Sequence, residues 1–369
     1  MKCYLLSSVL PHDPHNGHDL RFIHLLPFLD EVFFVARREY GASGKKLDAG
    51  SAWKATQLDD LSGVRQHISR CEGGVWIAGD YAAFRMLESL RIQPVVYDGC
   101  DSQSLYFRRR FHHLPFWRFI KRLNALRWYL IWSRRERAIS SYCNGVVVPA
   151  SADGKAFKRW GCRRVGMVSN GTRWVSEPPI ERIPEARAMM FHGAFSWPVN
   201  LSTAEYLVNR VFPEVRKLAP DVRLRIAGHP VPESLQQIDP EGGVSMEGYV
   251  EDIRGWLSNC AVYVMPMLQG GGVKNKLLEV MALGVPAITN SLGAEAMDAE
   301  ARHCFVVADG PRNIAAAAVR LVRNPAEGRV LADRARAYAL EHFEWANLSD
   351  QYRSFLVDIA SEAGLEVSP

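Results

Sequence analysis

Short apolar runs alternate with longer amphipathic segments along the first half of the chain. The runs have the length of buried strands and lie at 1–10, 32–36, 75–78, 94–97 and 145–149. Strands that alternate with helices predict a parallel sheet with helices on both faces. We therefore predict an α/β domain over residues 1–172.

The alternation stops at a loop and then resumes. Asn170-Gly171-Thr172 and the prolines that follow it are typical of a loop, and we assign 173–187 as a linker. Strand-like runs return at 188–191, 223–227, 261–264 and 286–289, with helical patterns at 201–215, 275–283 and 312–323. They predict a second α/β domain over 188–340. A helical segment over 341–369 is expected to pack back on the first domain. Ligands of such open sheets bind at the carboxyl ends of the strands, here in the crevice between the two domains.

Composition and charge narrow the class of protein. The chain has 369 residues, of which 48% are hydrophobic and 23% charged, as expected for two folded α/β domains. Its seven cysteines form no Cys-x-x-Cys pair, which indicates a reducing compartment and no zinc site. The apolar run at the N-terminus is too short to span a bilayer. We expect a cytoplasmic protein, either free or peripheral on the inner face of the cell membrane.

A glycine-rich turn lies between a predicted strand and a predicted helix of the second domain. Its sequence is Gln269-Gly270-Gly271-Gly272-Val273-Lys274-Asn275-Lys276. A helix N-terminus presents unpaired N–H groups and the positive end of the helix dipole, which suit a phosphate group. The alternative is a turn with solvated lysines that caps an ordinary helix.

Glu279 follows on that helix. Leu278, Met281 and Ala282 have the spacing of a core-facing stripe, whereas Glu279 falls on the face of Lys276. A carboxylate accepts two hydrogen bonds, which suits the vicinal hydroxyls of a ribose. A Walker A loop is absent, as is a Gly-x-Gly-x-x-Gly after the first strand, so NTP hydrolysis and NAD binding lose support.

Residues 270–286 resemble the donor-site signature of family 4-type retaining glycosyltransferases, also called glycosyltransferase group 1. The loops at 192–200, 248–252, 291–295 and 170–172 are similar to loops of that family. The resemblance implies the GT-B fold, in which two Rossmann-like α/β domains face each other across a cleft. It also implies transfer of a sugar, with retention, from a nucleoside diphosphate sugar to a hydroxyl in the synthesis of a surface polysaccharide or glycoconjugate.

The same resemblance implies the roles of the donor site. Glu279 would bind the ribose, Lys274 or Lys276 the diphosphate, and no metal ion or other cofactor would be needed. The other implied donor-binding residues are Gly17, Gly193, Asn200, Tyr249, Val250, Gly270, Gly271 and Gly272. In two places the chain departs from the family. Many members have a glutamate at the position of Gly271, and the loop at 194–200 lacks an arginine and a lysine that many members carry.

Candidate residues of the first domain follow its predicted strands. The loop at 11–21 is similar to the N-terminal loop of the family, and we place His18 and Arg21 beside Gly17, with His18 as a catalytic candidate. Prolines in this loop argue against a metal site at its three histidines. Asp98 and Asp101 are candidates to orient or deprotonate an acceptor hydroxyl. The alternative is that Asp101 or Ser102 caps the next helix.

The segment 104–137 is both basic and aromatic. It contains ten lysine and arginine residues and nine aromatic ones, which suits an anionic membrane surface. Nucleic acid fits the same composition, and so does a pair of packed helices with solvated arginines. With the family resemblance, we predict a glycan or lipid-linked acceptor at a membrane and no nucleic acid.

Two other functions fit the same pattern. One is a nucleotide-sugar epimerase, or a phosphorylase, on the same fold. The other is a nucleotide-binding protein that has lost catalysis, which is consistent with the missing glutamate at Gly271.

Overall fold

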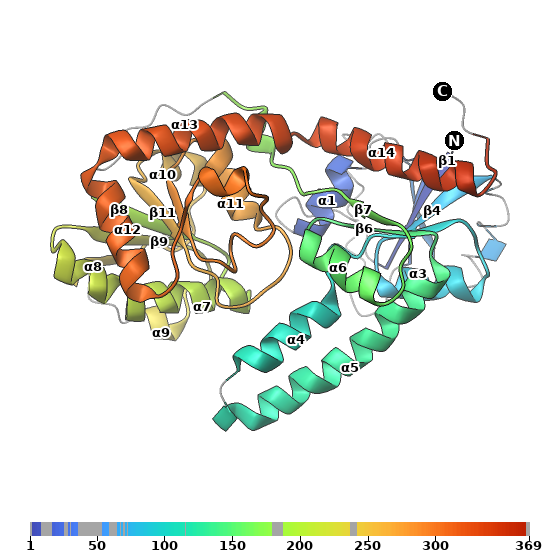
Figure 1. Cartoon of the computed structure of the whole chain (residues 1–369), viewed down its shortest axis with the longest axis horizontal. Helices are drawn as coiled ribbons and strands as arrows, with labels where there is room; N and C mark the ends of the chain where they lie inside the picture. Colours follow the sequence, from blue (N-terminus) through green and yellow to red (C-terminus); the bar gives the residue numbers. More distant parts are fainter. Residues whose placement is uncertain are drawn as a thin grey trace. The chain divides into compact units, whose positions relative to one another are not determined.

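The computed structural model describes residues 2–8, 17–25, 29, 31–35, 54–58, 65–66, 68, 71, 73–114, 116–178, 187–236 and 242–366, with the backbone alone at 17–20, 31–35 and 54–58. The chain divides into two compact units (Figure 1). Unit 1 consists of Met1–Asn170 and Trp345–Pro369, and unit 2 of Gly171–Glu344. Each unit is an α/β fold around one parallel sheet.

The sheet of unit 1 has seven strands in the order β3-β2-β1-β4-β5-β6-β7. All neighbouring strands are parallel. The strands are β1 (Lys2–Ser7), β2 (Glu31–Val35), β3 (Lys54–Leu58), β4 (Gly74–Ala78), β5 (Val95–Tyr97), β6 (Gly145–Val148) and β7 (Val165–Met167). The helices are α1 (Gly17–Leu25), α3 (Tyr81–Ser89), α4 (Gln103–His113), η1 (Phe116–Arg118), α5 (Phe119–Tyr142), α6 (Ser151–Arg159) and α14 (Trp345–Glu362).

The core of unit 1 lies on both faces of this sheet. Side chains of β1 alternate, so Tyr4 and Leu6 join the cluster on one face while Leu5 joins the cluster on the other. The last helix, α14, covers that second face, where Tyr352 is fully buried. Ser349 of α14 donates a hydrogen bond to the backbone oxygen of Leu25 at the end of α1 (2.9 Å). The C-terminal helix is therefore part of unit 1.

The sheet of unit 2 has six parallel strands in the order β10-β9-β8-β11-β12-β13. The strands are β8 (Ala188–His192), β9 (Arg223–Ala227), β10 (Val244–Met246), β11 (Val262–Met265), β12 (Ala287–Thr289) and β13 (Val306–Val307). The helical segments are η2 (Arg173–Val175), α7 (Pro198–Tyr206), η3 (Leu207–Val211), α8 (Phe212–Leu218), α9 (Glu233–Gln236), α10 (Ile253–Ser258), α11 (Asn275–Ala282), η5 (Ala301–His303), α12 (Pro311–Arg323) and α13 (Pro325–His342). This strand order is that of a Rossmann fold.

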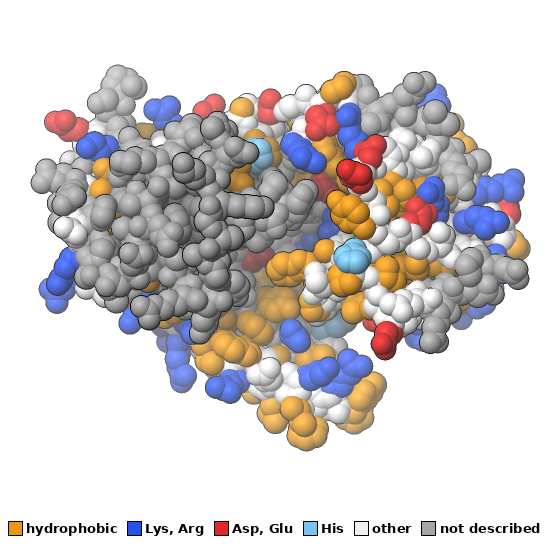
Figure 2. Space-filling model, turned by 180° about the vertical axis from the view of Figure 1, so that it is seen from behind, with side chains coloured by type: hydrophobic (Ala, Val, Ile, Leu, Met, Phe, Trp, Pro, Cys, Tyr) orange, Lys and Arg blue, Asp and Glu red, His pale blue; other side chains and the backbone are white. Residues whose placement is uncertain are grey.

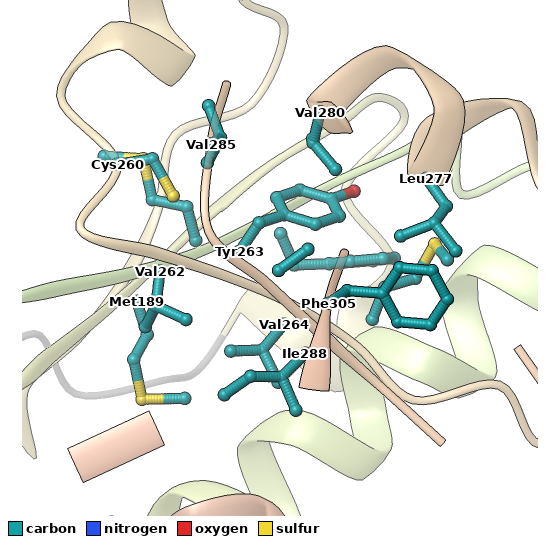
Figure 3. Close-up of a cluster of buried hydrophobic side chains, with 14 of the residues drawn as sticks. Met189, Cys260, Val262, Tyr263, Val264, Leu277, Val280, Val285, Ile288 and Phe305 are labelled. Atoms are coloured by element: carbon teal, nitrogen blue, oxygen red, sulfur yellow. The ribbon is translucent and has the colours of Figure 1, made fainter. Parts of the chain in front are cut away.

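The core of unit 2 includes the side chains packed between β11 and α11. Figure 3 shows the ring of Tyr263 in this cluster, beside Val280 of the helix, with Val264 and Ile288 from the sheet. The α/β fold class predicted from the sequence is confirmed. The sequence pattern did not predict β3, β7, β10 and β13, and these are the four edge strands of the two sheets. An edge strand pairs on one side only, so it can be short or partly polar and lacks the apolar run of a central strand.

Candidate functional site

The candidate donor site of unit 2 lies where the strand order of its sheet reverses. β8 pairs with β9 on one side and with β11 on the other. The chain therefore leaves β8 and β11 in opposite directions, which opens a crevice at their carboxyl ends. His192 ends β8, and the glycine-rich loop follows β11 before α11 begins at Asn275.

The glycine-rich loop needs glycine at two positions. Gly270 has φ of 114° and Gly272 has φ of 63°, a region of backbone conformation that disfavours other residues. The ammonium group of Lys274 donates to the backbone oxygen of Gly272 (2.9 Å) and to that of Gly271. In this arrangement Lys274 fastens the loop to the start of α11.

Three further loops meet beside it. The amide of Gly228, after β9, donates to the backbone oxygen of Gly248, after β10 (2.7 Å). A Cβ on Gly228 would lie 2.1 Å from the backbone oxygen of Gly193, after β8. A Cβ on Gly193 would lie 2.8 Å from Cγ of Asn200, whose side-chain amide donates to the backbone oxygen of Ala194 (2.8 Å). The structure thus brings the predicted Gly193 and Asn200 together and shows why the crossing point requires glycine.

Glu279 faces this crevice from α11. Its side chain is 28% exposed, and its Oε2 lies 3.6 Å from Nε2 of His192, which is 12% exposed. The other ring nitrogen of His192, Nδ1, lies 3.1 Å from the hydroxyl of Tyr263. Because a carboxylate only accepts, we assign the imidazole hydrogen to Nε2, so that Tyr263 donates to Nδ1. The two side chains orient the carboxylate from the side of the sheet.

The charges around Glu279 favour its ionised form. Burial acts to raise the pKa of Glu279, but His192, Lys276 and Arg173 together outweigh it, so the pKa is lowered. Burial lowers the pKa of His192, and the neighbouring carboxylate offsets this only in part. Burial likewise lowers the pKa of Lys276. At neutral pH the site therefore holds a carboxylate next to a neutral imidazole.

Four residues of this site were missed as site residues by the sequence analysis. His192 opens the loop at 192–200 but received no role of its own, Tyr263 stands in an apolar strand run, and Arg173 lies in the segment assigned as a linker. Asn290, after β12, accepts a hydrogen bond from the amide of Met267 (2.9 Å) and donates to its backbone oxygen (2.7 Å), so it holds the loop after β11. Position along the chain could have indicated two of them, because His192 and Asn290 each follow a predicted strand at its carboxyl end.

The predicted base-binding residues lie on the loop after β10. Tyr249 is 75% exposed, and Val250 is partly buried against the core of unit 2. Asp252 closes this loop by accepting a hydrogen bond from the amide of Gly255 at the start of α10 (2.8 Å). The role of the loop in binding a base stays a prediction.

In unit 1, Asp98 is bound to Arg21. Both side chains are fully buried, and Nε of Arg21 lies 3.0 and 3.1 Å from the two carboxylate oxygens. Nη1 of the same arginine donates to the backbone oxygen of Val168 (2.9 Å) and to Oδ1 of Asn170 (3.1 Å). The pair ties α1 to the loop after β5 and to the chain after β7. As described, the side chain of Asp98 is buried and paired, so its predicted action on an acceptor hydroxyl stays a prediction.

The other candidates of unit 1 lie around it. Asp101 is partly exposed, and Ser102 is the residue that caps α4, since its hydroxyl accepts from the amide of Leu105 (3.2 Å). Gly17 and His18 are the first residues of α1, and the side chain of His18 lies outside the described part, as do His12 and His15. Among the described residues, the structure has no group of three His, Cys, Asp or Glu side chains that could hold a metal ion. Within the same residues, no helix is long and apolar enough to cross a membrane.

Comparison with known proteins identifies the domain that holds this site. Residues 186–324 match the family model of the glycosyl transferases group 1. This segment is a group 1 glycosyltransferase domain. It contains the residues of the candidate donor site from His192 to Asn290, whereas Arg173 lies before the matched segment.

The chain is also similar to other known proteins in sequence or in fold. The chain is 25% identical over 164 residues to an uncharacterized 44.6 kDa protein in the cps region of Klebsiella pneumoniae, a match that covers 42% of each protein. The Anabaena protein HepE in complex with UDP has a TM-score of 0.71 at 15% identity, over 97% of this chain and all of that one. Sucrose-phosphate synthase from Thermosynechococcus elongatus has a TM-score of 0.76 at 14% identity, over 98% and 100% of the two chains. These likenesses show that the fold is that of GT-B glycosyltransferases.

Proposed function

We propose that this chain transfers a sugar from a nucleoside diphosphate sugar to a hydroxyl group of a glycan or lipid-linked acceptor. The observation that carries the proposal is the carboxylate of Glu279, which lies 3.6 Å from Nε2 of His192 at the point where the sheet of unit 2 reverses its strand order, and whose pKa is lowered by the positive groups around it. The likeness to HepE, which was crystallised with UDP and with UDP-glucose, supports a donor of this kind.

The parts of the donor would bind to different loops. The two oxygens of Glu279 would accept hydrogen bonds from the ribose hydroxyls. The diphosphate would lie at the N-terminus of α11, against the N–H groups of the glycine-rich loop and the positive charge of Lys276 and Arg173. The base would contact the backbone at Tyr249 and Val250.

In the proposed reaction, stabilisation of the leaving diphosphate makes the largest contribution to lowering the activation barrier. Negative charge develops on the diphosphate as its bond to the sugar breaks, and a preorganised positive site stabilises that charge. We propose that Lys276, Arg173 and the dipole of α11 supply this site without a divalent metal ion, and that the sugar is transferred with retention. Asp101 and His18 remain the candidates to orient the acceptor, because Asp98 is bound to Arg21.

We further propose that the enzyme works at an anionic membrane, in the synthesis of a surface polysaccharide or glycoconjugate. A lipid-linked acceptor is held at a membrane, so the enzyme must reach that surface. The basic, aromatic segment 104–137 of unit 1 supports this location.

Purified protein tests the proposal directly. Thermal-shift screening against UDP, GDP, ADP and dTDP is expected to give a stabilising shift with one of them. The matching nucleotide sugar should then release its nucleoside diphosphate, in the presence of EDTA as well as in its absence. No shift with any nucleotide and no release would contradict the proposal. Binding without release would instead indicate a nucleotide-binding protein that has lost catalysis.

A further inference from the structure

Two helices of unit 1 form a hairpin that extends away from the sheet of the unit (Figure 1). The hairpin consists of α4, η1 and α5, residues 103–142. α5 has 24 residues, which corresponds to a length of about 36 Å. Its buried residues are Ala125, Glu136, Ile139 and Ser140, so the helix is packed against the unit mainly at its C-terminal end. The other end of the hairpin has few contacts with the body of the unit.

The base of the hairpin is fixed by buried hydrogen bonds. Glu136 of α5 accepts from the amide of Ser104 (2.9 Å) and from the hydroxyl of Ser102 (3.1 Å), at the start of α4. The amide of Ser102 donates in turn to Asp153 of α6 (2.9 Å). These bonds anchor both helices to α6 at the base of the hairpin.

The aromatic side chains of the hairpin fall into two groups. Along its length they pack between the helices: Phe107 stacks on Trp128 with ring centroids 5.9 Å apart, and Arg122 lies over the ring of Phe111 at 4.7 Å. For these residues the packed-helix alternative of the sequence analysis is correct. At the tip, residues 116–123, the large apolar side chains instead face solvent. They are Phe116, Trp117, Phe119, Ile120 and Leu123, with exposed fractions from 58% to 74%.

The tip stands out from the rest of the surface. Seven of the thirteen exposed large hydrophobic side chains of the described residues belong to the hairpin, and five of these seven lie in the tip. Figure 2 shows hydrophobic and basic side chains side by side on the part of the molecule at the bottom of the view. Since exposed apolar clusters cost solubility, such a patch indicates a contact surface.

The charge of the hairpin indicates which kind of partner the exposed tip would bind. No aspartate or glutamate occurs between Gln103 and Arg135, whereas nine lysine and arginine residues do. The formal net charge of the whole chain is only +5, so the remainder of the chain is net acidic. A second copy of the hairpin would be repelled by like charge. Nucleic acid would use the arginines and the aromatic rings but would leave Ile120 and Leu123 without a partner.

We propose that the tip inserts into the interfacial region of an anionic phospholipid membrane, where the flanking basic residues bind lipid phosphates. Trp117, Phe116 and Phe119 suit the boundary between headgroups and acyl chains, and Ile120 and Leu123 suit its apolar side. Insertion is limited to the interface, because no helix of the described residues could cross the bilayer. This inference rests on the proposed function, which explains why the protein would bind a membrane: a lipid-linked acceptor would be found at the same surface.

Vesicle flotation with the full-length protein tests the inference. The probes are phosphatidylcholine vesicles with and without phosphatidylglycerol. Wild-type protein is expected to float with the anionic vesicles and to be released by salt, because exposed charge contacts are screened. The triple variant Trp117→Ser, Phe119→Ser, Ile120→Ser should lose about tenfold or more in partitioning, since three apolar anchors are removed.

Two controls keep the result specific. The variant Leu218→Ser, Val330→Ser also removes exposed apolar side chains, but from α8 and α13 of unit 2, and should float like wild type. The thermal shift that the nucleotide gives in the tip variant should equal that in wild type, which shows that the variant is folded.

A failed donor test with intact flotation would refute the transfer reaction and leave membrane binding standing. The inference is overturned if wild type ignores anionic vesicles, if neutral vesicles bind it equally well, or if the tip variant still floats.

Discussion

Oε2 of Glu279 lies 3.6 Å from Nε2 of His192, so the last residue of β8 positions a carboxylate on α11. Behind the imidazole, Tyr263 of β11 lies within hydrogen-bond distance of Nδ1. The three side chains come from three elements that meet at the centre of the sheet of unit 2. Under the proposed function, a carboxylate positioned in this way would lose little conformational freedom on binding a ribose, which would favour affinity.

Replacing Glu279 by glutamine should weaken nucleotide binding about ten- to one-hundredfold, because an ionised acceptor of two hydrogen bonds becomes a neutral amide. Titration calorimetry with the preferred nucleotide measures the effect. The matched control is Glu341→Gln, a 76% exposed carboxylate on α13. Equal nucleotide affinities of Glu279→Gln and wild type would contradict the proposal that Glu279 binds the ribose.

His192 should titrate below its ordinary pKa of about 6.5, because burial disfavours the charged imidazole. The neighbouring carboxylate raises that pKa, so in Glu279→Gln the imidazole should titrate lower still. NMR titration of the histidine ring protons measures both values, and His192→Gln assigns the signal. A pKa of His192 above 6.5, or an upward shift in Glu279→Gln, would contradict this account.

The same pKa predicts how nucleotide affinity depends on pH. As pH falls through the pKa of His192, the imidazolium forms an ion pair with Glu279 and competes with the ribose for its oxygens. Wild-type affinity should therefore fall at acidic pH, and His192→Gln should lack this step. Calorimetry across the pH range tests it, with His303→Gln, an exposed histidine of the same unit, as the control.

Gly228→Ala should destabilise unit 2 by about 3 kcal/mol, because the added Cβ would lie 2.1 Å from the backbone oxygen of Gly193 and neither backbone can yield easily. Gly242→Ala, where a Cβ would have no atom within 4 Å, should stay within about 0.5 kcal/mol of wild type. Chemical denaturation followed by a probe in unit 2 measures the difference. Equal stabilities of the two variants would show that the loops do not meet as described.

Asp98→Asn should destabilise unit 1 by about 3–5 kcal/mol, because it leaves the charge of buried Arg21 without its partner. Asp358→Asn breaks a 3.8 Å ion pair whose carboxylate is 63% exposed, so its effect should be below about 1 kcal/mol. Thermal unfolding compares the two. If Asp98→Asn keeps its stability and loses turnover, Asp98 has the catalytic role predicted from the sequence and the structural role is wrong.

Much of the fold could be predicted from apolar periodicity alone. The central strands and the helical C-terminal segment have strong apolar patterns. The edge strands were not predicted, because each has a neighbouring strand on one side only and therefore lacks a long apolar run. The hairpin shows the same limit, since Phe107 and Trp117 belong to one aromatic segment and yet one is packed between helices while the other is 69% exposed.

The sequence by itself determined the α/β class and the glycine-rich loop before α11, and it singled out Glu279 as the candidate carboxylate. Each of these depends on local order along the chain, which spacing records. Only the tertiary structure decided that His192 and Tyr263 support Glu279, that Asp98 is neutralised by Arg21, and that the apolar tip of the hairpin is exposed. The contacts of Glu279 and of Asp98 join residues 71 to 87 positions apart in the sequence. The exposure of the tip depends on the absence of packing partners around it. No local sequence pattern carries either kind of information.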